Sequence, residues 1–243
     1  MSARITAATS LRVLQQIRHD HRTIALLLVV PSALLFLLDE LLGAFQFDRL
    51  GGPMLGMFPF ITMFLVTSIS MLRERTTGTL ERLMTMPLAK LDLLAGYGIA
   101  FALLAAVQGL VTSAFAFGVL GLDTPGSPAL IVFLAVVDAV LGSALGLLAS
   151  AFASTEFQAV QFMPAIVLPQ ILLCGLLVPR EQMAGWLDAV ASVLPLTLAF
   201  EALDAVGVDG AGLSEVGDEV AVLAAMIAVA IALGALTLRR RTA

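Results

Sequence analysis

The chain has 243 residues, of which 60% are hydrophobic and only 13% are charged. Soluble domains carry about a quarter charged residues, and disordered chains are poor in apolar ones, so this composition excludes both classes. The single cysteine, Cys174, excludes an intrachain disulfide, and the net charge of −5 argues against a nucleic-acid partner. A chain of this kind is expected to cross a lipid bilayer several times.

Six apolar segments are long enough to cross a membrane, because a spanning helix needs about 20 mainly apolar residues. The first covers residues 23–38 and is expected to continue past Asp39 and Glu40 to about Phe45. Four of the others are uncharged runs, at residues 50–72, 93–122, 157–179 and 220–238. The last, at residues 128–153, is also apolar but contains Asp138. None of these runs alternates apolar and polar residues, so the sequence predicts an all-α integral membrane protein.

The basic residues predict how the chain is oriented. Eleven of the thirteen Lys and Arg residues lie in three segments that share one side of the membrane if there are six spans. These segments are residues 1–22, the loop at residues 73–92 and the C-terminal Arg239, Arg240 and Arg241. The positive-inside rule therefore predicts a multi-pass protein of the cell membrane (inner or plasma) with both termini in the cytoplasm.

Two segments outside the spans are expected to form amphipathic helices. In residues 1–22, Arg12 and His19 share one helical face, which is typical of a basic helix resting on the inner leaflet. Residues 180–219 are acidic and include Trp186, a side chain that favours the membrane interface. This external segment, between the fifth and sixth spans, is expected to hold re-entrant or interfacial helices.

The loop at residues 73–92 has a helical pattern of its own. Gly78 is expected to end the second span, and a short helix is expected to start near Thr79 and to end at Pro87. The apolar face of this helix is formed by residues at i, i+3, i+4 and i+7, namely Leu80, Leu83, Met84 and Pro87. Such a helix either rests on the membrane with its charges solvated or docks a soluble partner.

This loop resembles the coupling region of ABC-2 type permeases, the membrane subunits of ATP-driven exporters. The residues that carry the resemblance are Arg73, Glu74, Gly78, Thr79, Leu80, Glu81, Leu83 and Pro87. A second match is similar to the end of the fifth span and the external helices of that family. It consists of Leu173, Cys174, Gly175, Pro179, Met183, Trp186, Leu187 and residues 194–197. The resemblance covers nearly the whole chain, which looks most like the drug-resistance permeases.

The resemblance implies an exporter subunit that moves a hydrophobic or amphipathic substrate outward and pairs with a second copy of itself or a paralogue. A separate ATP-binding subunit would bind ATP and Mg, and would dock on residues 78–87, with the N-terminal helix as its second contact. The implied polar contacts to that subunit are Glu74, Glu81 and Arg82, and the implied apolar contacts are Leu80 and Leu83. Gly78, Thr79 and Pro87 mark the start and the end of the docking helix.

The ATP-driven motor is expected on another chain. A phosphate-binding loop needs Gly-Lys-Ser/Thr, and the one lysine, Lys90, stands between Ala89 and Leu91. The chain is therefore predicted to be a transport subunit without cofactor or catalysis of its own. No metal site is expected, because His19 and His21 lie outside the spans and have no H-E-x-x-H context.

Asp138 is the one acid deep within a predicted span. Ionisable residues inside a membrane are costly and often functional, and Gly142 and Gly146 share its helical face in a small-xxx-small pattern. Asp138 is therefore expected to face protein or a cavity, with three roles open: packing or hydrogen bonding, the transport path, or proton coupling. Two alternatives to an ABC permease follow, a proton-coupled secondary transporter that uses Asp138 and a non-transporting membrane scaffold.

Overall fold

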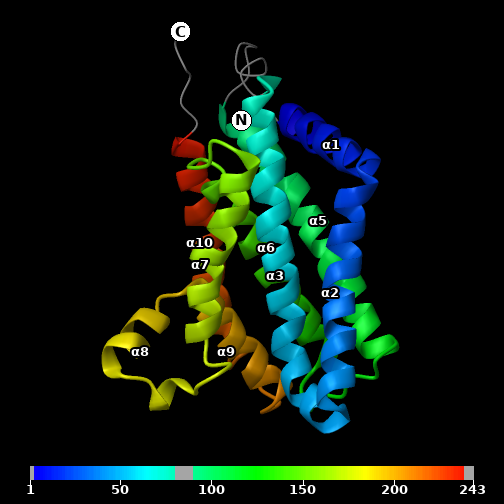
Figure 1. Cartoon of the computed structure of the whole chain (residues 1–243), viewed down its shortest axis with the longest axis vertical. Helices are drawn as coiled ribbons and strands as arrows, with labels where there is room; N and C mark the ends of the chain where they lie inside the picture. Colours follow the sequence, from blue (N-terminus) through cyan, green and yellow to red (C-terminus); the bar gives the residue numbers. More distant parts are fainter. Residues whose placement is uncertain (1–2, 80–89, 238–243) are drawn as a thin grey trace.

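The computed structural model describes residues 3–79 and 90–237, and every regular element within these ranges is a helix (Figure 1). The predicted docking residues between 80 and 87 lie outside the described residues. In chain order the elements are α1 (Ala3–His19), α2 (His21–Leu42), α3 (Ala44–Thr76), α5 (Lys90–Gly118), α6 (Pro128–Ala149), α7 (Glu156–Leu173), η1 (Arg180–Gln182), α8 (Gly185–Ala191), α9 (Pro195–Gly207) and α10 (Gly217–Leu236).

Six of the described helices are long and apolar enough to cross a membrane, which confirms the predicted number. They are α2, α3, α5, α6, α7 and α10. In Figure 1, α1 and the last turn of α10 lie at one end of the bundle, and α8 lies at the opposite end. We call these the α1 end and the α8 end. An even number of crossings places the two ends of a chain on the same side, and the arrangement agrees with this.

The connection between the first two spans differs from the prediction. The helix of the first span includes Asp39 and Glu40, as expected, but ends at Leu42, and α3 begins at Ala44, well before residue 50. Gly43 makes the turn with φ of +71°, a conformation that L side chains rarely adopt. The charge gap at residues 50–72 marks the apolar part of the helix, whereas the helix itself also includes charged residues at both ends, among them Asp48 and Arg73.

The pair α3 and α6 forms the centre of the bundle. A Cβ atom at Gly142 would overlap the carbonyl oxygen of Phe60, and one at Gly146 would overlap the carbonyl oxygen of Phe64. Both contacting positions advance by four residues, so the two helices run parallel at very close range. The predicted small-xxx-small pattern is thus a helix-packing surface, as expected of glycines in membrane helices.

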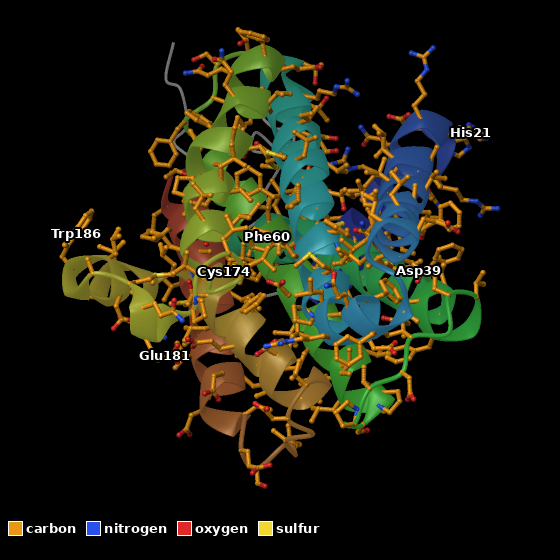
Figure 2. The ribbon with its side chains drawn as sticks, turned by 60° about the horizontal axis from the view of Figure 1, so that its bottom comes forward. His21, Asp39, Phe60, Cys174, Glu181 and Trp186 are labelled. Carbon is orange, nitrogen blue, oxygen red and sulfur yellow. The ribbon has the colours of Figure 1, made fainter. Side chains whose placement is uncertain are left out.

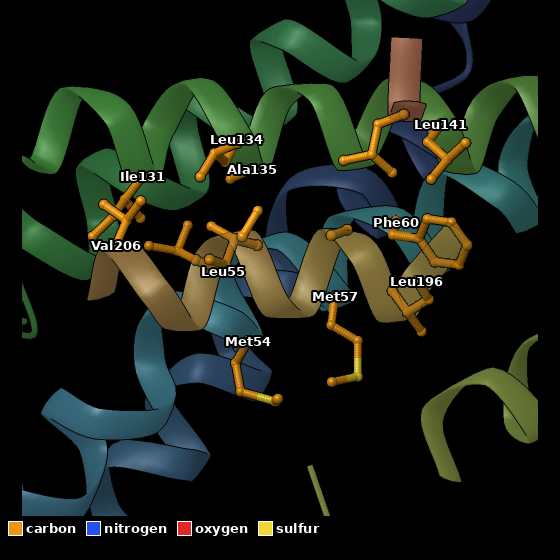
Figure 3. Close-up of a cluster of buried hydrophobic side chains, with 14 of the residues drawn as sticks. Met54, Leu55, Met57, Phe60, Ile131, Leu134, Ala135, Leu141, Leu196 and Val206 are labelled. Atoms are coloured by element: carbon orange, nitrogen blue, oxygen red, sulfur yellow. The ribbon is translucent and has the colours of Figure 1, made fainter. Parts of the chain in front are cut away.

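A cluster of buried apolar side chains joins α3 and α6 to α9 (Figure 3). Leu55 and Phe60 of α3 meet Leu134 and Leu141 of α6, and Leu196 of α9 completes the cluster. Four methionines of α3 are buried in this cluster or in a second one between α1, α3 and α5: Met54, Met57, Met63 and Met71. Their burial favours ordinary packing over a lining of the transport path.

Residues 180–219 contain a broken pair of helices. α8 and α9 are bent by 87° at the break between Ala191 and Pro195, which makes the pair either a re-entrant loop or a broken span. The side-chain amide of Gln170 accepts a hydrogen bond from the backbone N–H of Leu196 at 3.2 Å, and donates to the carbonyl oxygen of Ile166 at 3.0 Å. Gln170 therefore pairs a backbone N–H at the start of α9, which has no partner within its own helix, and ties α9 to α7.

Candidate functional site

Glu74 lies at the α1 end, near the last turn of α3, and only 5% of the residue is exposed. Its carboxylate accepts hydrogen bonds from both terminal nitrogens of Arg12, at 3.3 and 3.4 Å, and from the hydroxyl of Tyr97 at 2.8 Å. Arg12 also donates to the Tyr97 hydroxyl, and its guanidinium lies 5.6 Å from the centre of the Tyr97 ring. These three residues, which we call the Glu74 cluster, join α1, α3 and α5.

The Glu74 cluster is costly to break because its carboxylate is buried. A buried charge that loses its partner costs several kcal/mol, whereas a buried pair with good hydrogen bonds is tolerated. The contact between α1 and α5 is close elsewhere as well, since the Ser10 hydroxyl donates to the carbonyl oxygen of Gly96 at 2.8 Å. α1 is therefore anchored to the bundle by polar contacts as well as by the apolar residues Val13 and Ile17.

A second charged group lies beside this cluster on the surface. Arg73 contacts both carboxylate oxygens of Glu156 on α7, at 2.7 and 3.1 Å, and lies 3.9 Å from Asp20. Asp20 caps the start of α2, and hydrogen bonds from the hydroxyl and the backbone N–H of Thr23 hold the pKa of Asp20 below its ordinary value. Neighbouring residues of α3 thus connect that helix to four others at the α1 end.

The structure places the predicted docking residues as follows. Glu74 was expected to contact a partner, but its carboxylate is buried and bonded within the chain. Gly78 has φ of +72° and lies just beyond the end of α3, as expected of a residue that ends the helix. Thr79 is next to it, with its hydroxyl 3.1 Å from that of Thr77. The remaining docking residues, Leu80, Glu81, Arg82, Leu83 and Pro87, lie outside the described residues, and their roles stay predictions.

Sequence reasoning missed two members of the Glu74 cluster. The sequence pattern placed Arg12 with His19 on one face of a helix resting on the inner leaflet, and it assigned no role to Tyr97. Tyr97 is the one tyrosine of the chain and lies in a mainly apolar helix. A buried tyrosine usually finds a partner for its hydroxyl, so this residue was the available signal.

Asp138 lies midway along α6, and 1% of it is exposed. It faces Gly56 of α3, where a Cβ atom would lie 2.9 Å from the carboxylate oxygen Oδ2, and Leu203 of α9 approaches the same spot. Among the described residues neither of its oxygens has a hydrogen-bond partner. Asp138 therefore faces protein and not lipid, as the sequence predicted, but no buried donor compensates its carboxyl group.

Comparison with known proteins identifies the family. The family model described as "ABC-2 type transporter" matches residues 5–206. The probable multidrug ABC transporter permease YbhR of Escherichia coli strain K12 is 31% identical over 143 residues, which cover 59% of this chain and 39% of that protein. ABC transporter G family member 20 of Dictyostelium discoideum is 27% identical over 168 residues, covering 68% of this chain and 23% of that protein.

The matched parts amount to less than half the length of either relative. The family model, by contrast, covers most of the present chain, from α1 to the end of α9. It thus includes the Glu74 cluster, Asp138 and the bent pair of helices α8 and α9. The chain therefore belongs to the ABC-2 type transporter family.

Proposed function

We propose that this chain is the permease subunit of an ABC exporter and moves a hydrophobic or amphipathic substrate outward across the cell membrane. ATP and Mg are bound by a separate subunit, which docks on residues 78–87 and on α1. The permease pairs with a second copy or a paralogue. The α1 end then faces the cytoplasm, in line with the positive-inside rule, because α1 carries three arginines and the last turn of α3, at the same end, carries two more.

The observation that carries this proposal is the position of the Glu74 cluster. Glu74 precedes the docking segment on the same stretch of chain, and its bonds to Arg12 and Tyr97 join α1 and α5 to α3. A displacement of residues 78–87 by an ATP-binding subunit is therefore transmitted to three helices at once. Buried, hydrogen-bonded pairs suit this task because they hold elements in one discrete arrangement.

The double variant Glu81→Lys with Leu83→Asp tests the docking segment. It reverses one charge and places another on the proposed apolar contact, so we expect at least about tenfold less ATP-binding subunit to co-purify with the full chain. Glu215→Lys is the matched control, because it reverses an exposed charge at the α8 end. Assembly of the double variant at the level of the control, with ATP-driven transport intact, would rule out docking at this segment.

A second candidate function rests on Asp138. A buried carboxyl group without a hydrogen-bond donor among the described residues, halfway along a spanning helix, is suited to bind and release a proton. A proton-coupled transporter of this kind would move substrate along a pH gradient without ATP.

Asp138→Asn separates the two functions. We expect ATP-driven efflux of the dye Hoechst 33342 to persist in this variant, because the exporter does not use the charge. The measurement is dye efflux from proteoliposomes that contain the chain and its ATP-binding subunit, with ATP alone and with a pH gradient alone. Efflux that runs on the pH gradient and disappears in Asp138→Asn would support the proton-coupled alternative instead.

A further inference from the structure

A cavity of about 600 Å³ opens at the α8 end of the chain. Its walls come from the first turns of α3, the segment from Cys174 to Glu181, and the second half of α9 with the residues that follow. Figure 2 shows Cys174 and Glu181 on this side of the molecule, while Trp186 projects away from it on α8. The volume lies within the range of about 300–1,000 Å³ that small-molecule sites occupy.

The charged side chains of this cavity are predominantly acidic. The acids Glu181, Glu201, Asp204 and Asp209 face only two bases, Arg49 and Arg180, so the formal charge of the lining is −2.

One of the two basic side chains, Arg180, is already paired with carboxylates. Arg180 donates to Asp188 at 2.8 Å and also pairs with Glu201. Burial and the nearby Asp209 raise the pKa of Asp204 above its ordinary value, although the positive field of Arg49 acts in the opposite direction. Within the described part of the chain, no ion pair involves Glu181 or Asp209, and both are exposed. The excess of negative charge therefore remains available to a ligand.

Apart from the amide of Gln46, the rest of the lining is apolar. Leu50 comes from α3, Leu176 follows α7, and Phe200 projects from α9, with the buried Cys174 beside them. The cavity thus combines an apolar wall with an acidic rim. A bare metal ion does not suit it, since no three His, Cys, Asp or Glu side chains in residues 3–79 and 90–237 are grouped to hold one.

We propose that this cavity binds an amphipathic cation, a molecule with an apolar body and a permanent or protonated positive group. The apolar body packs against Leu50, Leu176 and Phe200, and the positive group lies near Glu181 and Asp209. The inference deepens the proposed function, on which it rests for the outward direction of transport, because it names the class of molecule that leaves by this cavity.

The test compares two ions of nearly equal size and opposite charge, tetraphenylphosphonium and tetraphenylborate. Binding of each is measured by equilibrium dialysis on the full chain in nanodiscs of zwitterionic phosphatidylcholine, with uptake by empty discs subtracted. We expect saturable binding of tetraphenylphosphonium and at least tenfold weaker binding of tetraphenylborate. The double variant Glu181→Gln with Asp209→Asn should weaken tetraphenylphosphonium binding about tenfold.

Asp123→Asn is the control, because Asp123 is exposed at the same end but does not line the cavity. Equal binding of the two ions, or equal loss in the control and in the double variant, would overturn the proposal. These measurements need neither ATP nor a partner, so they do not depend on the exporter assignment. Conversely, a chain that assembles with its ATP-binding subunit but does not discriminate the two ions would retain the proposed function and lose only this inference.

Discussion

Replacing Gly142 with alanine is expected to destabilise the fold strongly, although alanine is the best helix former. The new Cβ atom would overlap the carbonyl oxygen of Phe60, which belongs to the backbone of α3 and cannot turn aside. Overpacking of a close helix contact costs about 1–3 kcal/mol, and the shift of α6 would also disturb the neighbouring contact at Gly146. We expect the free energy of unfolding to fall by this amount.

Gly98→Ala provides the matched comparison. Gly98 also lies within a spanning helix, but the atom nearest to a Cβ at this position would be Cδ1 of Ile231 at 3.9 Å, an ordinary contact. Helix propensity then favours alanine by up to about 1 kcal/mol. Thermal unfolding of both purified variants in the same detergent measures the difference. Equal unfolding temperatures for Gly142→Ala and Gly98→Ala would show that α3 and α6 do not pack this closely.

Replacing Glu74 with glutamine is expected to be the second costly change. The side chain keeps its size, but Arg12 loses its counter-charge and the Tyr97 hydroxyl loses a charged acceptor in a buried position. Because the side chain of Glu74 is 6% exposed and that of Arg12 is 35% exposed, Arg12 can recover some hydration. We therefore expect a loss of about 2–3 kcal/mol, below the range for a fully buried pair.

Glu156→Gln is a closely matched control. Glu156 also accepts two hydrogen bonds from an arginine, the adjacent Arg73, but both side chains are 52% exposed. Exposed ion pairs contribute at most about 1 kcal/mol, so Glu156→Gln should change the unfolding temperature little. If the two glutamine variants unfold alike, the Glu74 cluster does not stabilise the fold as a buried pair.

Glu74→Gln also has a functional consequence that stability alone does not give. If the Glu74 cluster transmits motion from the docking segment, the variant should still bind the ATP-binding subunit but should transport less substrate per ATP hydrolysed. The measurement is the ratio of transport to ATP hydrolysis at a temperature where the variant is fully folded. An unchanged ratio would reduce the cluster to a structural contact.

Much of the fold could be predicted because the membrane imposes strong rules on sequence. Six long apolar runs predicted six spanning helices, and the structure confirms that number within the described residues. Gly78 was expected to end the second span, and its φ of +72° agrees. The helix bounds were less accurate, as at Ala44, because hydropathy reports the apolar part of a helix and not its hydrogen-bonded length.

The candidate site was predicted only in part. The loop after α3 was identified from the spacing of residues that are close together in the chain, and such spacing can be seen in the sequence without knowledge of the fold. The partners of Glu74 come from positions 12 and 97, which no spacing rule relates to position 74. The cavity at the α8 end is likewise formed by segments far apart in the chain.

The amino-acid sequence by itself determined the class of protein, the number of spans, the glycine surface of α6 and the resemblance to ABC-2 permeases. Each of these depends on composition or on short-range sequence patterns. Such patterns are informative because every spanning segment must be apolar and must satisfy its own backbone hydrogen bonds in the bilayer. Only the tertiary structure decided that Glu74 is buried between Arg12 and Tyr97, that Asp138 faces Gly56, and that acids and apolar residues share one cavity. Those facts depend on which helices pack together, and packing is set by the fit of whole surfaces.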